Sequence, residues 1–184
     1  MDCTDLWKGR PRIADVGTGT GCIVIVLAVA RAEADYTAID CSPDALALAR
    51  ENAKQLPIQF IDGDLLAGIG DASLDAVVSN PPYIASAAIV KLDPWIRDHE
   101  PIGALDGGEA GTEILARLIS DAARALKPGG RIFLEIGDDQ AVAVRALLRG
   151  AGFHRVHVTK DMSGNDRIAT GIKGGEGMIT LGNV

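Results

Sequence analysis

Four polar or glycine-rich segments each directly follow a stretch that the sequence predicts as a β-strand. They are Gly17–Gly21, Asp40, Asp62–Asp64 and Asn80–Tyr83. In an open parallel sheet, ligands bind outside the carboxyl ends of the strands, near the point where the strand order reverses. The sequence therefore predicts one ligand site that is built from these four segments.

The last of these segments, Asn80-Pro81-Pro82-Tyr83, favours recognition of a planar amino group. Its two prolines stiffen the chain and remove two backbone donors. The remaining polar groups are the side-chain oxygen of Asn80 and the carbonyl of Pro81, and an –NH2 group has two donors that would satisfy both. The aromatic ring of Tyr83 would form one flat side of the predicted site. We predict these four residues as the catalytic segment, with a plain Pro-Pro turn as the alternative.

The first segment is a glycine-rich turn between a strand and a helix, and it favours a cofactor held by backbone groups. Glycine allows positive φ and close approach of N–H groups to a ligand. A dinucleotide fingerprint would need glycine where Cys22 stands, and a phosphate loop would need a lysine that the turn lacks. The residues predicted to bind a cofactor here are Gly17, Thr18, Gly19, Thr20 and Gly21.

Two carboxylates are candidates for the nucleoside part of such a cofactor. Asp40 ends the second predicted strand, where a carboxylate can accept hydrogen bonds from ribose hydroxyls. Its alternative role is to cap the next helix, although Ser42 suits that role better. Asp64 can accept from an exocyclic amine while Leu65 covers a flat base. An Asx-type turn explains Asp64 equally well, and only one of Asp62 and Asp64 is expected to face the site.

Strand-like and helix-like stretches alternate along the chain, which predicts an α/β domain with a mostly parallel sheet. The predicted strands are 12–16, 36–40, 58–61, 74–79, 131–136, 153–159 and 167–172. The predicted helices are 21–31, 43–53, 112–126 and 138–151. Ser42 and Pro43 mark one helix start. The apolar run within 21–31 predicts a helix that is buried on most faces, and 80–111 is predicted as a long polar loop.

Composition narrows the class of protein. Of 184 residues, 47% are hydrophobic, which provides for a sizeable core, and the net charge of −7 disfavours nucleic acid as the main partner. Cys3, Cys22 and Cys41 form no close pair, so we expect free thiols and a cytoplasmic protein. The three histidines are scattered, so no metal site is expected, and no segment is long enough to span a membrane.

Taken together, the motifs resemble those of class I S-adenosylmethionine-dependent methyltransferases. The order Asp15-x-Gly-Thr-Gly-Thr-Gly, Asp40-x-Ser-Pro, Gly63-Asp64 and Ser79-Asn-Pro-Pro-Tyr carries the resemblance. More narrowly, the sequence resembles the HemK/PrmC family of release factor glutamine-N5 methyltransferases. The narrower evidence lies in 98–101, 104–108 with Gly111, 134–137 and 166–168.

The resemblance implies a Rossmann-like seven-stranded sheet with helices on both faces and an antiparallel last strand. It implies that S-adenosyl-L-methionine is the cofactor. Gly17 to Gly21 would hold its methionine part, Asp40 its ribose, and Asp64 with Leu65 its adenine, while Asp15 is a weaker candidate. Asn80 would lie where cofactor and substrate meet. The substrate would be the glutamine of the Gly-Gly-Gln loop of a peptide chain release factor.

The resemblance also sets the expected organisation. We expect residues 1–184 to form one catalytic domain without the family's N-terminal helical domain, and to act as a monomer. The segment Gly174–Val184 does not resemble the family's terminus. The alternatives are an N-methyltransferase of a nucleic-acid base (adenine N6 or ribosomal RNA guanine N2), since such enzymes share Asn-Pro-Pro-Tyr, and a cofactor-binding module without catalysis.

Overall fold

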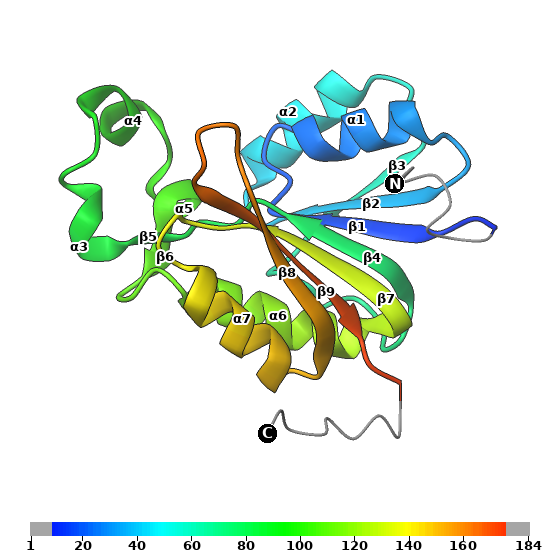
Figure 1. The fold of residues 1–184 in the computed structure, drawn as a ribbon. Helices are drawn as coiled ribbons and strands as arrows, with labels where there is room; N and C mark the ends of the chain where they lie inside the picture. Colours follow the sequence, from blue (N-terminus) through cyan, green and yellow to red (C-terminus); the bar gives the residue numbers. More distant parts are fainter. Residues whose placement is uncertain (1–8, 176–184) are drawn as a thin grey trace, which may run out of the picture.

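A computed structural model describes residues 9–175, so most of the Gly174–Val184 segment lies outside the described residues. Within 9–175, seven strands form one sheet in the order β3-β2-β1-β4-β7-β9-β8 (Figure 1). These strands are β1 (Arg12–Val16), β2 (Asp35–Asp40), β3 (Ile58–Asp62), β4 (Leu74–Ser79), β7 (Leu126–Glu135), β8 (Phe153–Lys160) and β9 (Asp166–Lys173). The first five run parallel, and β9 is antiparallel to both of its neighbours.

Helices cover both faces of this sheet, which confirms the predicted α/β architecture with an antiparallel last strand. The four longer helices are α1 (Cys22–Ala30), α2 (Pro43–Ala53), α6 (Glu113–Ala125) and α7 (Ala141–Gly150). Figure 1 shows α1 and α2 on one face and α6 and α7 on the other. The strand order reverses at β1, because the chain passes to β2 and β3 on one side and later to β4 on the other.

The core is aliphatic and lies mainly under α6 and α7. Leu115, Leu118 and Ile119 of α6 are fully buried and pack with Ile132 and Leu134 of β7. The central strands β1 and β4 are largely buried, as parallel strands between two helical layers must be, whereas the edge strand β3 has no buried residue. Because the sheet is tightly packed, the ends of its strands have fixed positions, and so do the starts of the loops at its carboxyl edge.

The prediction that α1 is buried on most faces is wrong. Only Val24 and Ala28 of this helix are buried, and Val26 and Val29 are 67% and 68% exposed. A helix in one covering layer contacts the sheet along a single stripe. Apolar residues outside that stripe are buried only when another element covers them, so the apolar run alone did not establish burial.

The long loop predicted at 80–111 instead contains short elements. These are β5 (Ile84–Ala85), α3 (Ser86–Ile89), α4 (Pro94–His99), α5 (Ile102–Leu105) and β6 (Asp106–Gly108). Strands β5 and β6 pair with each other and join the ends of an arm that projects from the body (Figure 1). The Ser86 hydroxyl also donates to the Asp106 carboxylate across the base of this arm, at 2.7 Å. The arm therefore leaves and rejoins the body next to Tyr83.

Candidate active site

The strand register places the predicted site segments side by side. Val16 pairs with Ile39 on one side and with Ser79 on the other, and Ser79 pairs with Leu134. The residues that follow these paired positions therefore lie in one row along the carboxyl edge of the sheet. This row contains Asp62, Asp40, Gly17, Asn80 and Glu135. The prediction of a shared edge is confirmed by the register, and Glu135 joins the row.

The glycine turn has the backbone shape that only glycine adopts easily. Gly17, Gly19 and Gly21 all have positive φ, at 66°, 55° and 84°. A Cβ atom built on Gly17 or Gly19 would meet no atom within 4 Å, whereas one on Gly21 would press on Ile25 and Ala49. Gly17 and Gly19 therefore leave open space for a ligand, while Gly21 allows α1 and α2 to pack closely.

Asp40 fastens this turn to the second strand. Its carboxylate accepts from the backbone N–H of Gly19 at 2.8 Å and from that of Ser42 at 2.9 Å. Ser42 is itself the N-cap of α2, since its hydroxyl oxygen accepts from the N–H of Ala45, and this confirms the predicted cap. A carboxylate has about four acceptor sites, so Asp40 retains capacity for ribose hydroxyls.

Asp15 lies directly beneath the same turn and is 1% exposed. One carboxylate oxygen accepts from the Thr18 hydroxyl at 2.7 Å and from the Val24 N–H at 3.1 Å, and the other has no partner within the described residues. Burial raises the pKa of Asp15 to about 6; these two hydrogen bonds oppose the rise, and the charge of Asp40 adds to it. The Thr18 side chain therefore points inward, while its backbone N–H donates to the Ile39 carbonyl and its carbonyl accepts from the Gly21 N–H.

Asp64 and Leu65, the residues predicted to hold the adenine, follow β3 and already have contacts within the protein. The Asp64 carboxylate is exposed and forms an ion pair with Arg117 of α6. Leu65 has a positive φ of 52° and packs against the core. Asp62 is exposed too, so the expected contrast between the two aspartates does not appear in their burial. An adenine role for Asp64 would require it to share its carboxylate with Arg117.

The predicted catalytic segment Asn80–Tyr83 is called the acceptor segment from here on. It begins directly after β4, whose end is hydrogen-bonded to β1. The Ser79 hydroxyl donates to the carbonyl of Val16 at 2.6 Å, which holds Asn80 beside the glycine turn. Pro81 is buried, but Asn80 is exposed. No hydrogen bond to the Asn80 side chain occurs among residues 9–175, so its amide is free to meet a substrate.

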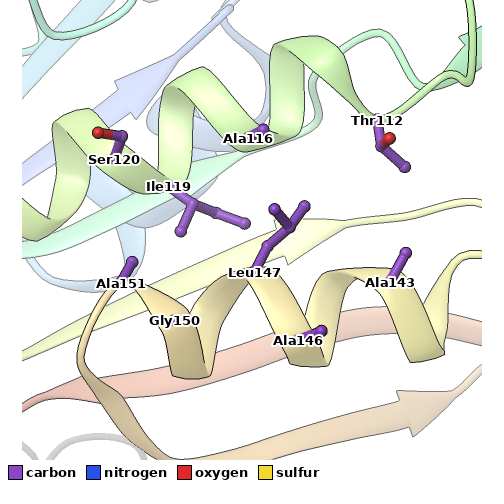
Figure 2. Close-up of a pocket in the computed structure, with 9 residues that line it drawn as sticks. All are labelled: Thr112, Ala116, Ile119, Ser120, Ala143, Ala146, Leu147, Gly150 and Ala151. Atoms are coloured by element: carbon purple, nitrogen blue, oxygen red, sulfur yellow. The ribbon is translucent and has the colours of Figure 1, made fainter.

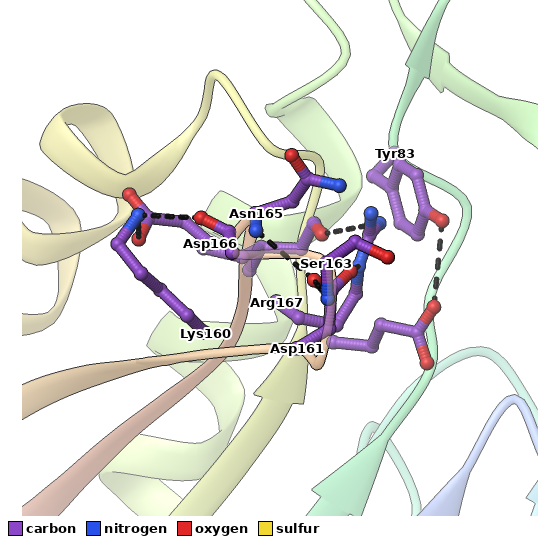
Figure 3. A network of polar contacts seen from close by, with 10 residues as sticks. Tyr83, Lys160, Asp161, Ser163, Asn165, Asp166 and Arg167 are labelled. Atoms are coloured by element: carbon purple, nitrogen blue, oxygen red, sulfur yellow. Dashed lines mark hydrogen bonds and ion pairs between the residues drawn. The ribbon is translucent and has the colours of Figure 1, made fainter.

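Tyr83 links the acceptor segment to Glu135 at the end of β7 (Figure 3). Its hydroxyl donates to the Glu135 carboxylate at 3.4 Å. Burial raises the pKa of Tyr83, the negative charge of Glu135 raises it further, and Arg167 opposes this. The Arg167 guanidinium donates to the carbonyl of Ile136 and pairs with Asp161 in the β8–β9 turn. Tyr83 therefore stays a neutral phenol, and the turn lies close to the site.

A second segment, residues 107–111, packs closely against Pro82 and Tyr83 of the acceptor segment, and its glycines make this contact possible. A Cβ on Gly107 would lie 2.8 Å from the Tyr83 Cα and 2.9 Å from the Pro82 carbonyl oxygen. A Cβ on Gly111 would lie 2.6 Å from the Tyr83 carbonyl oxygen. The Glu113 carboxylate closes the turn at 108–111 by accepting from the Ala110 N–H. The glycines of this segment are therefore required by close backbone contact.

Sequence reasoning missed Gln140, which is 7% exposed and lies behind the acceptor segment. Its side chain bonds to Tyr83, Gly111 and Gly137. Gln140 occupies the N-cap position of α7 without capping it through its side chain. Glutamine is not a preferred N-cap residue, so its position three residues after Gly137 and directly before a helix was the available signal.

Two hollows of the surface lie mainly outside this row of residues. One lies between α6 and α7, measures about 600 Å³ and is lined mainly by apolar side chains such as Ala116, Ala146 and Leu147 (Figure 2). Another, of about 400 Å³, lies between α1 and the sheet and reaches the row at Glu135, with Ser79 beside it.

Among residues 9–175, no three His, Cys, Asp or Glu side chains come together as metal ligands. The described helices are all too short or too polar to cross a bilayer. Cys22 and Cys41 are free and exposed.

The fold is that of the class I methyltransferases. Solved structures agree: a methyltransferase from Pyrococcus furiosus aligns with 91% of this chain and 77% of its own, at a TM-score of 0.67 and 21% identity. A ribosomal protein L11 methylase from Lactobacillus delbrueckii subsp. bulgaricus aligns with 89% of this chain and 71% of its own, at a TM-score of 0.63 and 22% identity.

Sequence comparison narrows the class. Residues 5–92 match the methyltransferase small domain family. The chain is 45% identical to the release factor glutamine methyltransferase of Caulobacter vibrioides over 163 residues, covering 86% of this chain and 56% of that one. It is 42% identical to the release factor glutamine methyltransferase of Deinococcus radiodurans, covering 90% of this chain and 59% of that one. Over most of its own length the chain is therefore similar to release factor glutamine methyltransferases, and it spans less than two thirds of the length of these relatives.

Proposed function

We propose that this chain transfers a methyl group from S-adenosyl-L-methionine to the side-chain amide nitrogen of a glutamine in a peptide chain release factor. The observation that carries this proposal is the position of Asn80. Its side chain is exposed, without a hydrogen bond among the described residues, and adjacent by register to the glycine turn. The relatives named above supply the substrate class.

The residues present fit the proposed cofactor. Gly17 and Gly19 leave open space beside the turn, which suits the methionine part of the molecule. Asp40 has acceptor sites left for the ribose, and Asp64 with Leu65 follows the neighbouring strand, where the adenine would lie. When bound, the cofactor supplies a methyl group that is already activated by a positively charged sulfur.

The protein's part in the reaction is mainly to position the amide. An amide nitrogen is a poor nucleophile because its lone pair is delocalised into the carbonyl. The oxygen of Asn80 and the carbonyl of Pro81 would accept both N–H bonds and fix the amide plane, while Tyr83 covers one side. The nitrogen would gain the methyl group as the methyl–sulfur bond breaks and its electron pair stays on the sulfur, and the nitrogen would lose one proton to solvent. Correct placement of the reacting atoms is then the main source of acceleration.

The partner and compartment follow from the same proposal. The net charge of −7 favours a protein substrate over a polyphosphate one. Exposed free thiols at Cys22 and Cys41 suit the reducing cytoplasm. We further infer that this chain acts as one catalytic domain and as a monomer.

The test is methyl incorporation followed by intact mass. The chain is incubated with the cofactor and, in separate reactions, a release factor, the same factor with the loop glutamine changed to alanine, and DNA or ribosomal RNA. We expect one added methyl group on the unchanged factor alone. Incorporation into nucleic acid, or equal incorporation into the alanine variant, would refute the glutamine assignment. Cofactor binding without any product would support a binding module instead.

A further inference from the structure

The side chain of Gln140 joins three chain segments that are far apart in the sequence. Its Nε2 donates to the carbonyl of Tyr83 at 2.8 Å and to that of Gly111 at 2.9 Å. Its Oε1 accepts from the N–H of Gly137 at 2.9 Å. One buried amide therefore connects the acceptor segment, the glycine segment behind it and the turn after β7.

These bonds allow a single orientation of the Gln140 amide. Both Nε2 hydrogens are used on carbonyl oxygens, and the oxygen is used on an N–H group. A flipped amide would set its oxygen against the Tyr83 and Gly111 carbonyls and its –NH2 group against the Gly137 N–H. Each of these contacts would leave a buried polar group unpaired, which is costly. The clamp formed by Gln140 is therefore rigid and specific for a primary amide.

The clamp acts on the part of the chain that would orient the substrate. Tyr83 directly follows Pro81 and Pro82, whose φ angles are fixed by their rings. Few rotatable backbone bonds lie between the Tyr83 carbonyl and the Pro81 carbonyl. A shift of Tyr83 would therefore also move the Pro81 carbonyl, which forms the acceptor pair with the Asn80 side-chain oxygen. Gly107 also packs against Pro82 and Tyr83 at closest contact, which prevents movement towards β6.

We propose that Gln140 is a positioning residue that fixes the acceptor pair formed by the Asn80 oxygen and the Pro81 carbonyl. This inference rests on the function proposed above. It names a residue that need not touch the cofactor or the substrate, because its bonds reach the acceptor segment from behind. The bonds of Gln140 include none to the glycine turn or Asp40. Removing the clamp should therefore lower turnover and leave cofactor affinity unchanged.

The experiment compares Gln140→Met and Gln140→Glu with the unchanged chain, and uses Gln59→Met as the matched control. Methionine keeps the length and volume of Gln140 but has no donor. Gln59 lies on β3, where its side chain is exposed and away from the acceptor segment. For each variant, kcat and KM for the release factor and the Kd for S-adenosylhomocysteine are measured at a temperature where circular dichroism shows a folded protein.

We expect Gln140→Met to lower kcat by about 10²-fold, the loss typical of a small misplacement of reacting groups, with Kd unchanged within twofold. Gln59→Met should match the unchanged chain. An ionised Gln140→Glu side chain would face two carbonyl oxygens, and protonation would restore one donor. Its kcat relative to the unchanged chain should therefore rise as the pH is lowered from 8 to about 6.

The outcomes separate the clamp from the proposed function. If the unchanged chain methylates the factor and Gln140→Met keeps kcat within threefold, the positioning role is wrong. A loss of turnover matched by an equal loss of cofactor affinity would mean that Gln140 only supports the fold, which also overturns it. If the unchanged chain transfers no methyl group while it binds the cofactor, the proposed function fails, and the clamp as stated fails with it.

Discussion

The buried carboxylate of Asp15 makes the stability of this protein depend on pH in an unusual direction. Burial raises its pKa from 3.8 to about 6 in the folded chain. A carboxyl group with a raised folded pKa stabilises the fold below its unfolded pKa, and this stabilisation is lost as the pH rises through the folded value. The contribution of Asp15 to stability therefore falls between about pH 4 and pH 6 and is constant above that window.

The magnitude follows from the two pKa values. Each pKa unit corresponds to about 1.4 kcal/mol, so the whole window corresponds to about 3 kcal/mol. Between pH 7 and pH 5, the linkage relation gives a gain of about 1.3 kcal/mol in the free energy of unfolding. Asp15→Asn removes this dependence. Its side-chain oxygen can still accept from Thr18 and Val24, the donors that Asp15 uses now.

The assay is urea unfolding of both proteins at half-unit steps from pH 7.5 to 5, without cofactor. Four other carboxyl groups have lowered pKa values and lose their stabilising effect only at more acidic pH: Asp98, Asp106, Glu113 and Asp161. They are common to both proteins, so the difference between the two curves isolates Asp15. Curves that stay parallel to within about 0.3 kcal/mol would refute the reasoning, because the Asp15 pKa would then be unshifted.

Three further predictions concern the site. Asp40→Ala should weaken S-adenosyl-L-methionine binding, measured by calorimetry, by at least about 1.5 kcal/mol, the value of one hydrogen bond to a charged acceptor; unchanged affinity would remove the ribose assignment. Asn80→Ala should reduce methyl transfer by at least about tenfold while cofactor affinity stays within twofold, since the lost acceptor acts on the amide in the transition state; near-normal turnover would contradict the acceptor role. Gly111→Ala should lower the free energy of unfolding by at least about 2 kcal/mol, because its φ is +75° and its Cβ would overlap Tyr83. Gly68→Ala is the control, since it meets no atom within 4 Å, and equal unfolding midpoints for the two variants would show that the glycine contact is not tight.

The sequence by itself determined the longer helices, the strands of the main sheet and the residue types at the strand ends. Strand β4 and helix α2 begin and end where their residues predicted, because an unbroken apolar run and a Ser-Pro start are local signals. The glycine turn was equally readable, since three glycines at alternate positions indicate positive φ, and all three have it. The row of strand-end residues followed from the rule that ligands bind at the carboxyl ends of parallel strands.

The tertiary structure alone decided what supports that row. The burial of α1 could not be read from its composition, because burial depends on which elements lie against it. The bonds of Gln140 to Tyr83 and Gly111 join positions 57 and 29 residues apart, and no local pattern reports such a distance. Glycines at 107 and 111 read as loop residues until the structure showed backbone atoms packed where their side chains would be. Local residue types thus set the strand ends, whereas long-range packing fixed the loops that follow them.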